Sequence, residues 1–441
     1  MRLQFIGILT ITLASVVPAF AQDRETKVRN DRAKFETSAE WIYNDLPKGI
    51  ATAKETGKPL LVVFRCIPCE ACAQLDEQVV ERDPGIRGLL DQFVCVRIVH
   101  ANGMDLSLFQ FDYDQSWAAF LMNADSTIYG RYGTRSHQTE SDNDVSLEGF
   151  GKALSGALAL HTRFTEIKDK LAAKRGPKSS VQAPEDFASL KGKYGSKLNY
   201  EGKVVQSCIH CHQVGEALRA VSRSQNQPIP EKVLYPYPNP KILGLILDPK
   251  AKAKVSQVVA GSSGAKDGFL AGDEIVELEG QPILSIADVQ WVLHHTGPTA
   301  RLKAKVTRAG KTIDVPVTLA EGWRQQDDIS WRATSWALRR MALGGLRLES
   351  LPDEARSAAK IPKDQLALRV QHVGQYNEHA AAKNAGFQKE DILVAVDNQT
   401  TPLTESALMA QLLQSHKSGE RIPVTVLRGG KRIDLKLPQQ Q

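Results

Sequence analysis

The sequence predicts a multidomain protein, in which an α/β domain is followed by a short helical segment and two β-rich units. The chain has 441 residues, and a typical domain size of about 150 residues gives about three domains. Residues 36–172 alternate between helical and strand patterns, as an α/β domain does. The stretch 268–273 recurs at 386–391, so the C-terminal half contains one unit twice.

The first 21 residues have the pattern of a secretory signal peptide. Arg2 precedes a short apolar run, and Ala19 and Ala21 form a small-x-small cleavage site before Gln22. The run is shorter than a bilayer-spanning helix, and no longer apolar run follows it in the sequence. We therefore expect a periplasmic or otherwise exported protein without a transmembrane segment after cleavage. An uncleaved signal that tethers the chain to a membrane is the alternative.

Composition excludes some functions and directs attention to the cysteines. The hydrophobic content of 42% is ordinary for a globular protein, and the net charge of +6 is spread without a basic stripe, so we expect no nucleic-acid binding. Five of the six cysteines lie in two tight clusters, at 66, 69 and 72 and at 208 and 211. Because disulfide-stapled folds distribute their cysteines along the chain, the clusters indicate site chemistry. The sixth, Cys95, lies within a strand pattern and is expected to be buried and inert.

The elements of the α/β domain can be assigned in order from their patterns. A continuous apolar run predicts a buried central strand at 60–64, directly before the first cysteine cluster. Ser146 is placed to cap the last helix. The full predicted order is helix 40–54, strand 60–64, helix 74–80, strand 93–99, a hairpin of strands 117–123 and 127–131, and helix 147–171.

This order resembles the thioredoxin-like fold, over a quarter to a third of the chain. In that family the first redox cysteine follows a strand-ending Phe by five residues, and Phe64 places Cys69 there. The resemblance implies that Cys69 is the attacking thiol at a helix N-terminus and that Cys72 resolves the mixed disulfide. The family's Trp before the first cysteine is Pro68 here, and no proline lies near 117, which argues against a broad reductase.

Cys66 is an additional thiol, and the first cluster therefore allows several interpretations. Cys66 could pair with Cys69, modulate it, or join Cys69 and Cys72 in binding a soft metal such as copper or zinc. The alternative is a thioredoxin-like scaffold with an inert structural disulfide.

The second cluster has the pattern Cys-x-x-Cys-His, formed by Cys208, Cys211 and His212. This pattern is the attachment site of a c-type haem, in which both thiols form thioethers and the imidazole ligates the iron. We assign it to a segment at 181–235, with a helix at 214–220 and a stiff proline-rich stretch at 228–240.

The second cluster also has alternatives. No Met or His between 213 and 250 can supply a sixth iron ligand, so Met104, Met341, His294 and His295 qualify only if another domain covers the haem. The iron could also be five-coordinate. A disulfide or a zinc site at Cys208, Cys211 and His212 is the other possibility, and His210, which we expect to point away from the site, could add a ligand.

The repeated units, at 240–321 and 341–438, both resemble bacterial PDZ domains. Residues 243–247, with Gly244, Leu245 and Ile246, match the family's carboxylate-binding loop and the strand after it, and 285–293 match the groove helix. In the second unit the loop contains Gly345 and Leu346, and the helix is expected at 405–414. The second match is weaker, because residues 356–365 look inserted and residue 390 is not the usual glycine.

The PDZ resemblance implies that each unit captures the C-terminal peptide of a protein partner. The peptide would pair with the exposed edge of the strand after the loop, and loop N–H groups would take its carboxylate. The alternative is that one or both units only pack internally or dimerise.

PDZ pairs often accompany serine proteases, but no Gly-x-Ser-Gly-Gly nucleophile turn occurs in the sequence, so we expect no serine protease.

Residues 322–340, which we call the connector, contain Trp323, Trp331 and Trp336 with several arginines, and an ordered link is expected there. The whole order resembles an exported bacterial family of thioredoxin-fold/PDZ proteins in which some members are selenoproteins.

Three functions remain open from the sequence. The first is an exported redox protein, such as a thiol-disulfide oxidoreductase, that combines thiol or haem electron chemistry with PDZ-mediated recruitment of an unknown redox partner. The second is a non-enzymatic PDZ scaffold with structural or metal-filled cysteine clusters. The third is metal handling by Cys66, Cys69 and Cys72.

Overall fold

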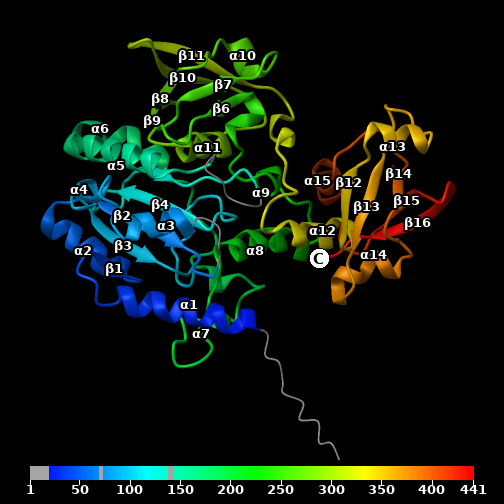
Figure 1. Ribbon diagram of the computed structural model, residues 1–441, viewed down its shortest axis with the longest axis horizontal. Coiled ribbons are helices and arrows are strands. Elements are labelled where there is room, and N and C mark those ends of the chain that lie inside the picture. Colours follow the sequence, from blue (N-terminus) through cyan, green and yellow to red (C-terminus); the bar gives the residue numbers. More distant parts are fainter. Residues whose placement is uncertain (1–18, 69–72, 138–143) are drawn as a thin grey trace, which may run out of the picture.

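The computed structural model describes residues 19–68, 73–137 and 144–441 (Figure 1). Its N-terminal part contains a five-stranded sheet in the order β1-β3-β2-β4-β5. Strands β1 and β2 run parallel to β3, whereas β4 is antiparallel to both β2 and β5. The strands are β1 (Trp41–Tyr43), β2 (Leu60–Arg65), β3 (Val94–Ile98), β4 (Trp117–Met122) and β5 (Ile128–Tyr132).

Helices cover both faces of this sheet, and two apolar clusters fill the space beneath them. The central strand β2 is buried at every residue, as its apolar run predicts. The helices of this domain are α2 (Leu46–Thr56), α3 (Ala73–Val80), α4 (Arg87–Leu90), α5 (Leu147–Thr162) and α6 (Phe164–Leu171), and α1 (Ala19–Phe35) precedes it.

Two helix predictions in this domain need correction. The helix expected at 40–54 begins only at Leu46, capped by Asp45, because Trp41–Tyr43 forms an edge strand beside β3. The helix expected at 147–171 is capped by Ser146 as predicted, but it breaks at Arg163, whose backbone leaves the helical region with φ −113° and ψ 21°.

The Cys-x-x-Cys-His segment packs directly against the thioredoxin-like sheet. Its helices are α7 (Val204–Ser207), α8 (Cys211–Ser224) and α9 (Glu231–Leu234). The buried side chains of Ile209, Cys211 and Val214 belong to the same apolar cluster as Phe64 of β2 and Phe120 of β4. The segment therefore extends the core of the N-terminal domain.

The first PDZ unit consists of two small sheets with helix α11 beside them. Strands β6 (Leu245–Leu247) and β7 (Val255–Val258) pair with each other, and the second sheet has the order β11-β10-β8-β9. Its other elements are α10 (Ser263–Asp267), β8 (Glu274–Leu278), β9 (Gln281–Pro282), α11 (Ile286–His295), β10 (Ala300–Arg308) and β11 (Lys311–Leu319).

The second PDZ unit has one sheet, in the order β12-β13-β14-β15-β16. Helix α12 (Ser335–Leu343) leads into it from the connector. The remaining elements are β12 (Leu346–Ser350), α13 (Asp353–Ala358), β13 (Leu368–Val373), α14 (Ala381–Asn384), β14 (Ile392–Val396), α15 (Glu405–Ser415), β15 (Arg421–Arg428) and β16 (Lys431–Pro438).

The repeated motif has the same structural role in both units. The Asp273 carboxylate accepts hydrogen bonds from the Leu270 N–H and from the Arg308 guanidinium. In the second unit Asp391 makes the equivalent bonds with Gln388 and Arg428. In each unit the aspartate thus links the turn before one strand, β8 or β14, to the neighbouring strand, β10 or β15. This shared role explains why the stretch recurs.

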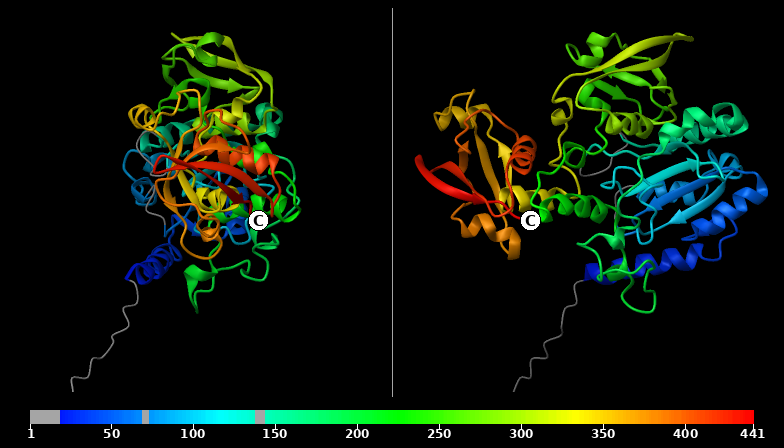
Figure 2. Two further views of the ribbon diagram at one scale, coloured as in Figure 1. Left: turned by 90° about the vertical axis from the view of Figure 1, so that its right-hand side faces the viewer. Right: turned by 180° about the vertical axis from the view of Figure 1, so that it is seen from behind.

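The first PDZ unit docks onto the N-terminal domain, whereas the second contacts helix α8 (Figure 2). Lys174 Nζ lies 2.9 Å from Asp288 of α11, and both side chains are fully buried. The Arg131 guanidinium lies 3.5 Å from the centroid of the Trp291 ring. Helices α8 and α12 lie between the N-terminal sheet and the second PDZ unit. None of the helices in the described ranges is both long and apolar enough to cross a membrane.

Candidate functional site

Cys66 lies at the end of the central strand β2. Its N–H donates a hydrogen bond to the Ser116 carbonyl at 2.9 Å, which continues the pairing of β2 with β4, and its side chain is 8% exposed. Cys69 and Cys72, which the sequence predicts to be the redox pair, lie outside the described residues.

The loop that follows β3 brings the second cysteine cluster to this place. The Ala101 N–H donates to the Ile209 carbonyl at 2.8 Å. The Asn102 side chain accepts from the Ile209 N–H at 2.8 Å and donates to the Ser207 carbonyl at 2.9 Å. Because β2 and β3 are parallel, their carboxyl ends share one edge of the sheet. The Cys-x-x-Cys-His segment is therefore held against the residue that follows β2.

Cys66 and His210 meet at this edge. The Cys66 Sγ atom lies 3.2 Å from His210 Nδ1, although 144 residues separate them in the sequence. His210 is the residue before α8, and its N–H donates to Gln213 Oε1 at 2.8 Å. Gln213 in turn donates to the Tyr194 hydroxyl at 2.9 Å. The start of α8 thus turns the His210 ring toward Cys66, and the expectation that this ring points away from a haem stays a prediction.

The His210 imidazole is neutral at physiological pH. Burial, with a further contribution from His212, lowers the pKa of His210 to about 4. In a neutral imidazole one ring nitrogen carries a hydrogen, and the other is free to accept a proton. An imidazole within hydrogen-bond distance of a thiol can accept its proton, although the lowered pKa makes His210 a weaker base than an ordinary histidine.

A buried acid with two arginines lies beneath the site. The Asp76 carboxylate of α3 accepts from Arg97 at 2.8 and 2.9 Å and from Trp117 Nε1 at 3.0 Å. Arg65, the residue before Cys66, lies 3.5 Å from the same carboxylate. These contacts fix the start of α3 to β2, β3 and β4, and so fix the frame around Cys66.

The three residues expected to hold a haem flank His210 in the sequence, and the two cysteines among them are buried. The side chains of Cys208 and Cys211 are only 5% and 9% exposed. The His212 ring stacks on the His210 ring with centroids 5.6 Å apart, and His212 Nδ1 lies 3.5 Å from the Glu216 carboxylate. A haem held by two thioethers needs both sulfurs and the imidazole to face one flat cofactor. Cys211 packs in the same apolar cluster as Phe64 of β2.

A metal site is not formed by described residues alone. Within residues 19–68, 73–137 and 144–441, no group of three or more Cys, His, Asp or Glu side chains is arranged to hold a metal ion. A zinc or copper site would therefore need Cys69 or Cys72 in addition to Cys66 and His210.

Cys95 contrasts with these residues. It lies in β3, its side chain is buried in the core, and burial raises the pKa of Cys95 to about 12. The thiol is thus protonated and inert, as its place in the strand pattern predicts.

The peptide-binding residues predicted for the PDZ units lie at strand edges. Gly244 has φ +75°, and a Cβ atom there would lie 2.2 Å from the Ser262 side chain. Leu245 and Ile246 follow in β6, which pairs with β7 on one side, and no further described strand pairs with it. Gly345 has φ +90°, and Leu346 begins the edge strand β12. Glycine is required at both loops for these conformations.

Comparison with known families identifies three regions of the chain. A family described as thioredoxin-like matches residues 41–124, and a PDZ domain family matches residues 231–319 and 354–438.

Curated relatives match through the PDZ part only. The periplasmic pH-dependent serine endoprotease DegQ of Escherichia coli is 28% identical over 189 residues, which cover 43% of this chain and 37% of that protein. A probable periplasmic DegP-like serine endoprotease of Chlamydia trachomatis is 26% identical, over 52% of this chain and 40% of its own length. The chain spans about two fifths of the length of these relatives.

Solved structures resemble the chain over short parts. The PDZ domain of EpsC from Vibrio cholerae is 22% identical and covers 22% of this chain and 94% of its own, with a TM-score of 0.16. The HtrA-type protease AlgW with a decapeptide is 13% identical and covers 32% of this chain and 49% of its own, with a TM-score of 0.21. From the family matches and the sheet orders, the chain contains one thioredoxin-like domain and two PDZ domains.

Proposed function

We propose that the chain is an exported thiol redox protein that recruits its protein partner through a PDZ domain. The observation that carries this proposal is the contact between Cys66 and His210, in which two cysteine motifs far apart in the sequence form one thiol–imidazole site. A scaffold with inert cysteines would not need an imidazole at this distance from a thiol. The signal-like N-terminus and the periplasmic relatives support export.

The chemistry of the site would be thiol–disulfide exchange. The Cys66 thiol gives its proton to His210, and the thiolate attacks one sulfur of a partner disulfide. A mixed disulfide forms and the partner's other sulfur leaves as a thiolate. A second thiol, for which Cys69 and Cys72 are the candidates, then attacks Cys66 of the mixed disulfide, closes an intramolecular disulfide and releases the partner with both thiols reduced.

The first PDZ unit would bring the partner to this site. The edge of β6, with Gly244, Leu245 and Ile246, would pair with the extended C-terminus of the partner. Because α11 of this unit is fixed to the N-terminal domain by the Lys174–Asp288 ion pair, a bound partner is held next to the thioredoxin-like domain.

The role of His210 is tested with two single variants. His210→Gln should slow the reaction of Cys66 with a small aromatic disulfide at pH 7 by about 100-fold, because the general base is lost. His372→Gln changes an exposed histidine of the second PDZ unit, is the control, and should react like the wild type. The rate of mixed-disulfide formation at Cys66 is followed by mass spectrometry. Equal rates in the wild type and His210→Gln would exclude the proposed base, and the scaffold alternative would then be preferred.

A c-type haem is the second candidate, and the complete Cys-x-x-Cys-His pattern favours it. Cys208 and Cys211 would hold the porphyrin and His212 would ligate the iron, which would supply one-electron chemistry. Protein produced with a haem-attachment system should then show a Soret band and an intact mass about 616 Da above the apo chain. In that case His212→Gln, and not His210→Gln, changes the spectrum. A colourless product of apo mass excludes the haem.

A further inference from the structure

The second PDZ unit makes an internal contact at the position where a peptide would bind. The Leu348 N–H of β12 donates a hydrogen bond of 2.6 Å to Glu405 Oε1 of α15. β12 is the edge strand of its sheet and pairs only with β13 among the described strands. A peptide that adds to this edge needs the N–H groups that point away from β13. In this unit the Leu348 N–H already has an acceptor.

Glu405 is fixed in this position by a buried ion pair. Arg339 of α12 donates to both carboxylate oxygens, at 3.0 and 2.6 Å. The same guanidinium donates to Ser335 Oγ and to the Ser330 carbonyl, at 2.8 and 3.0 Å. Both side chains of the pair are buried. A bidentate pair with its remaining donors satisfied is rigid, so the Leu348 contact is maintained.

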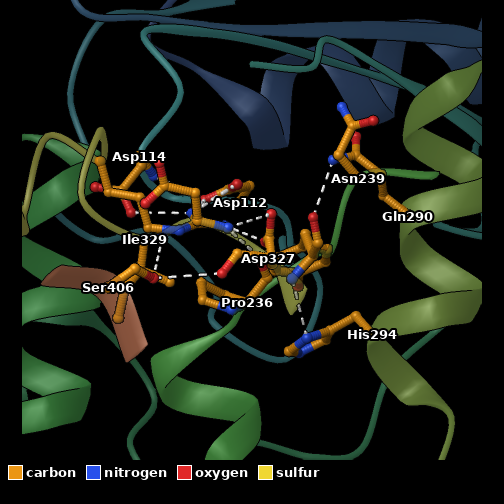
Figure 3. A network of polar contacts seen from close by, with 12 residues as sticks. Asp112, Asp114, Pro236, Asn239, Gln290, His294, Asp327, Ile329 and Ser406 are labelled. Carbon is orange, nitrogen blue, oxygen red and sulfur yellow. Dashed lines mark hydrogen bonds and ion pairs between the residues drawn. The ribbon is translucent and has the colours of Figure 1, made fainter. Parts of the chain in front are cut away.

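The connector lies along α15, the helix that begins with Glu405. Ile329 is fully buried in the apolar cluster of the second PDZ unit, and its N–H donates to Ser406 Oγ at 3.0 Å. Ser406 Oγ donates in turn to the Asp327 carbonyl at 3.3 Å. Figure 3 shows Ser406 below Ile329, with dashed lines that join it to Ile329 and to Asp327. The connector therefore covers the first turn of α15, which begins with Glu405.

The first PDZ unit lacks this arrangement. Its groove helix α11 begins with Ile286, which has no acceptor atom at the position of Glu405. The residue of β6 that corresponds to Leu348 is Leu247, and no side chain among the described residues accepts its N–H. The two units thus share a fold but differ at the hydrogen bond that a peptide needs.

We propose that the second PDZ unit is a peptide site held closed by its own chain. The connector at 327–330 and the Glu405–Arg339 pair occupy it, and the first PDZ unit is the one that accepts a C-terminal peptide. A cavity of about 530 Å³ reaches Glu405 and is lined by Asp327, Ser330 and Leu348, so a competing peptide can approach the closed site. The inference extends the peptide-binding part of the proposed function and is independent of its thiol chemistry.

The test measures how many peptides the full chain binds. The probe is a fluorescein-labelled decapeptide with an apolar last residue and a free carboxylate, and stoichiometry is measured by titration. The wild type should bind one peptide. The double variant Glu405→Leu with Arg339→Leu removes both charges, which avoids an unpaired buried charge, and should bind two. The matched control is Asp353→Leu with Lys363→Leu, which removes an exposed pair in the same unit, outside β12 and α15, and should bind one.

Amide hydrogen exchange at Leu348 provides a second readout. In the wild type this amide should exchange slowly without peptide, and in the double variant it should become slow only when peptide is added. If the double variant does not fold, the measurement on the wild type alone tests the proposal. Fast exchange of the Leu348 amide, or an exchange rate that falls when peptide is added, would contradict closure.

The outcomes separate this inference from the proposed function. Two peptides bound to the wild type, or no additional peptide bound to a folded double variant, would overturn the closed second unit. No peptide on the wild type and one on the double variant would support closure but would remove the first PDZ unit from the proposed recruitment.

Discussion

Asp327 shows how one buried carboxyl group can make the stability of the fold depend on pH. Burial raises the pKa of Asp327 to about 6, although Arg332 lies 3.8 Å away and lowers it, while Asp112 and Asp328 raise it further. The folded-state pKa thus exceeds the ordinary value of about 3.9. A raised pKa means that the stability contributed by Asp327 is full below about pH 4 and is lost as the pH rises through about 6.

The Asp327→Asn variant tests this directly. At pH 8 it should have a higher free energy of unfolding than the wild type, by at most about 3 kcal/mol, because it removes a buried charge. At pH 4 the two proteins should differ little, since Asp327 is then protonated. Urea unfolding at the two pH values measures the difference, and Asp364→Asn, at an exposed aspartate of the second PDZ unit, is the control. A gain of the same size at both pH values would contradict the assigned cause.

The candidate site could be predicted from the sequence only in part. The residue types and spacings in the two cysteine clusters were sufficient to single out Cys66, Cys208, Cys211 and His212. The partner of Cys66 was not predictable, because His210 is 144 residues away and only the packing of the segment against β2 and β3 joins them. A local pattern contains no information about such a contact.

Glu390 shows that the turn of the repeated motif can form without the glycine that the first PDZ unit has there. The first PDZ unit has Gly272 at φ +95°, and the second keeps the left-handed turn with Glu390 at φ +71°. This conformation costs a residue other than glycine roughly 1–2 kcal/mol. The bonds from Asp391 to the turn and to Arg428 hold it in place. The second unit therefore resembles a PDZ domain less closely in its sequence than in its fold.

At the scale of elements, buried strands were predicted well and edge elements were not. The apolar run at β2 and the hairpin of β4 and β5 lie where the sequence places them, because β2 and β4 are apolar at most positions, as strands buried on both faces are, and a short turn joins β4 to β5. Strand β1 was missed, since three residues at a sheet edge give no pattern of their own and Trp41 also fits a helical period. Short edge strands depend on the neighbour with which they pair.

Helix α11 has a second role that periodicity does not predict. All residues from 286 to 293 are buried. Val289 and Val292 belong to the core of the first PDZ unit, while Asp288 and Trp291 contact Lys174 and Arg131 of the N-terminal domain. A groove helix with polar residues on one side would normally face water. Here Asp288 and Trp291 form the interface, so the groove helix of the first PDZ unit is held against the thioredoxin-like domain.

At the scale of the whole molecule, one buried network joins the domains. Arg332 of the connector donates to both oxygens of Asp112, each at 2.9 Å, and to Asp114 at 3.2 Å. Asp114 also accepts from the Thr334 N–H at 3.0 Å, and Arg219 of α8 lies 3.8 Å from it. Burial raises the pKa of Asp112, whereas Arg332 and Arg219 hold the pKa of Asp114 below its ordinary value against the effect of burial.

This network explains why the connector is ordered. It ties residues 112–114 of the N-terminal domain to α8 and to the residues that precede α12. The sequence indicated an ordered connector from its tryptophans and arginines, but it could not assign the acids, because these lie about 220 residues away. The connector that covers α15 is therefore anchored in the thioredoxin-like domain, and the state of the second PDZ unit depends on that anchor.

Replacing Arg332 tests whether the anchor holds the molecule together. Arg332→Met should lower the free energy of unfolding by about 3–5 kcal/mol, because it leaves the Asp112 and Asp114 charges buried without their main partner. The connector should also become sensitive to limited proteolysis, and the radius of gyration from X-ray scattering should increase as the second PDZ unit separates. Arg301→Met removes an exposed arginine of β10 and should change neither measurement. If Arg332→Met behaves like this control, the buried acids do not anchor the connector, and the closed state of the second PDZ unit must rest on Glu405 and Arg339 alone.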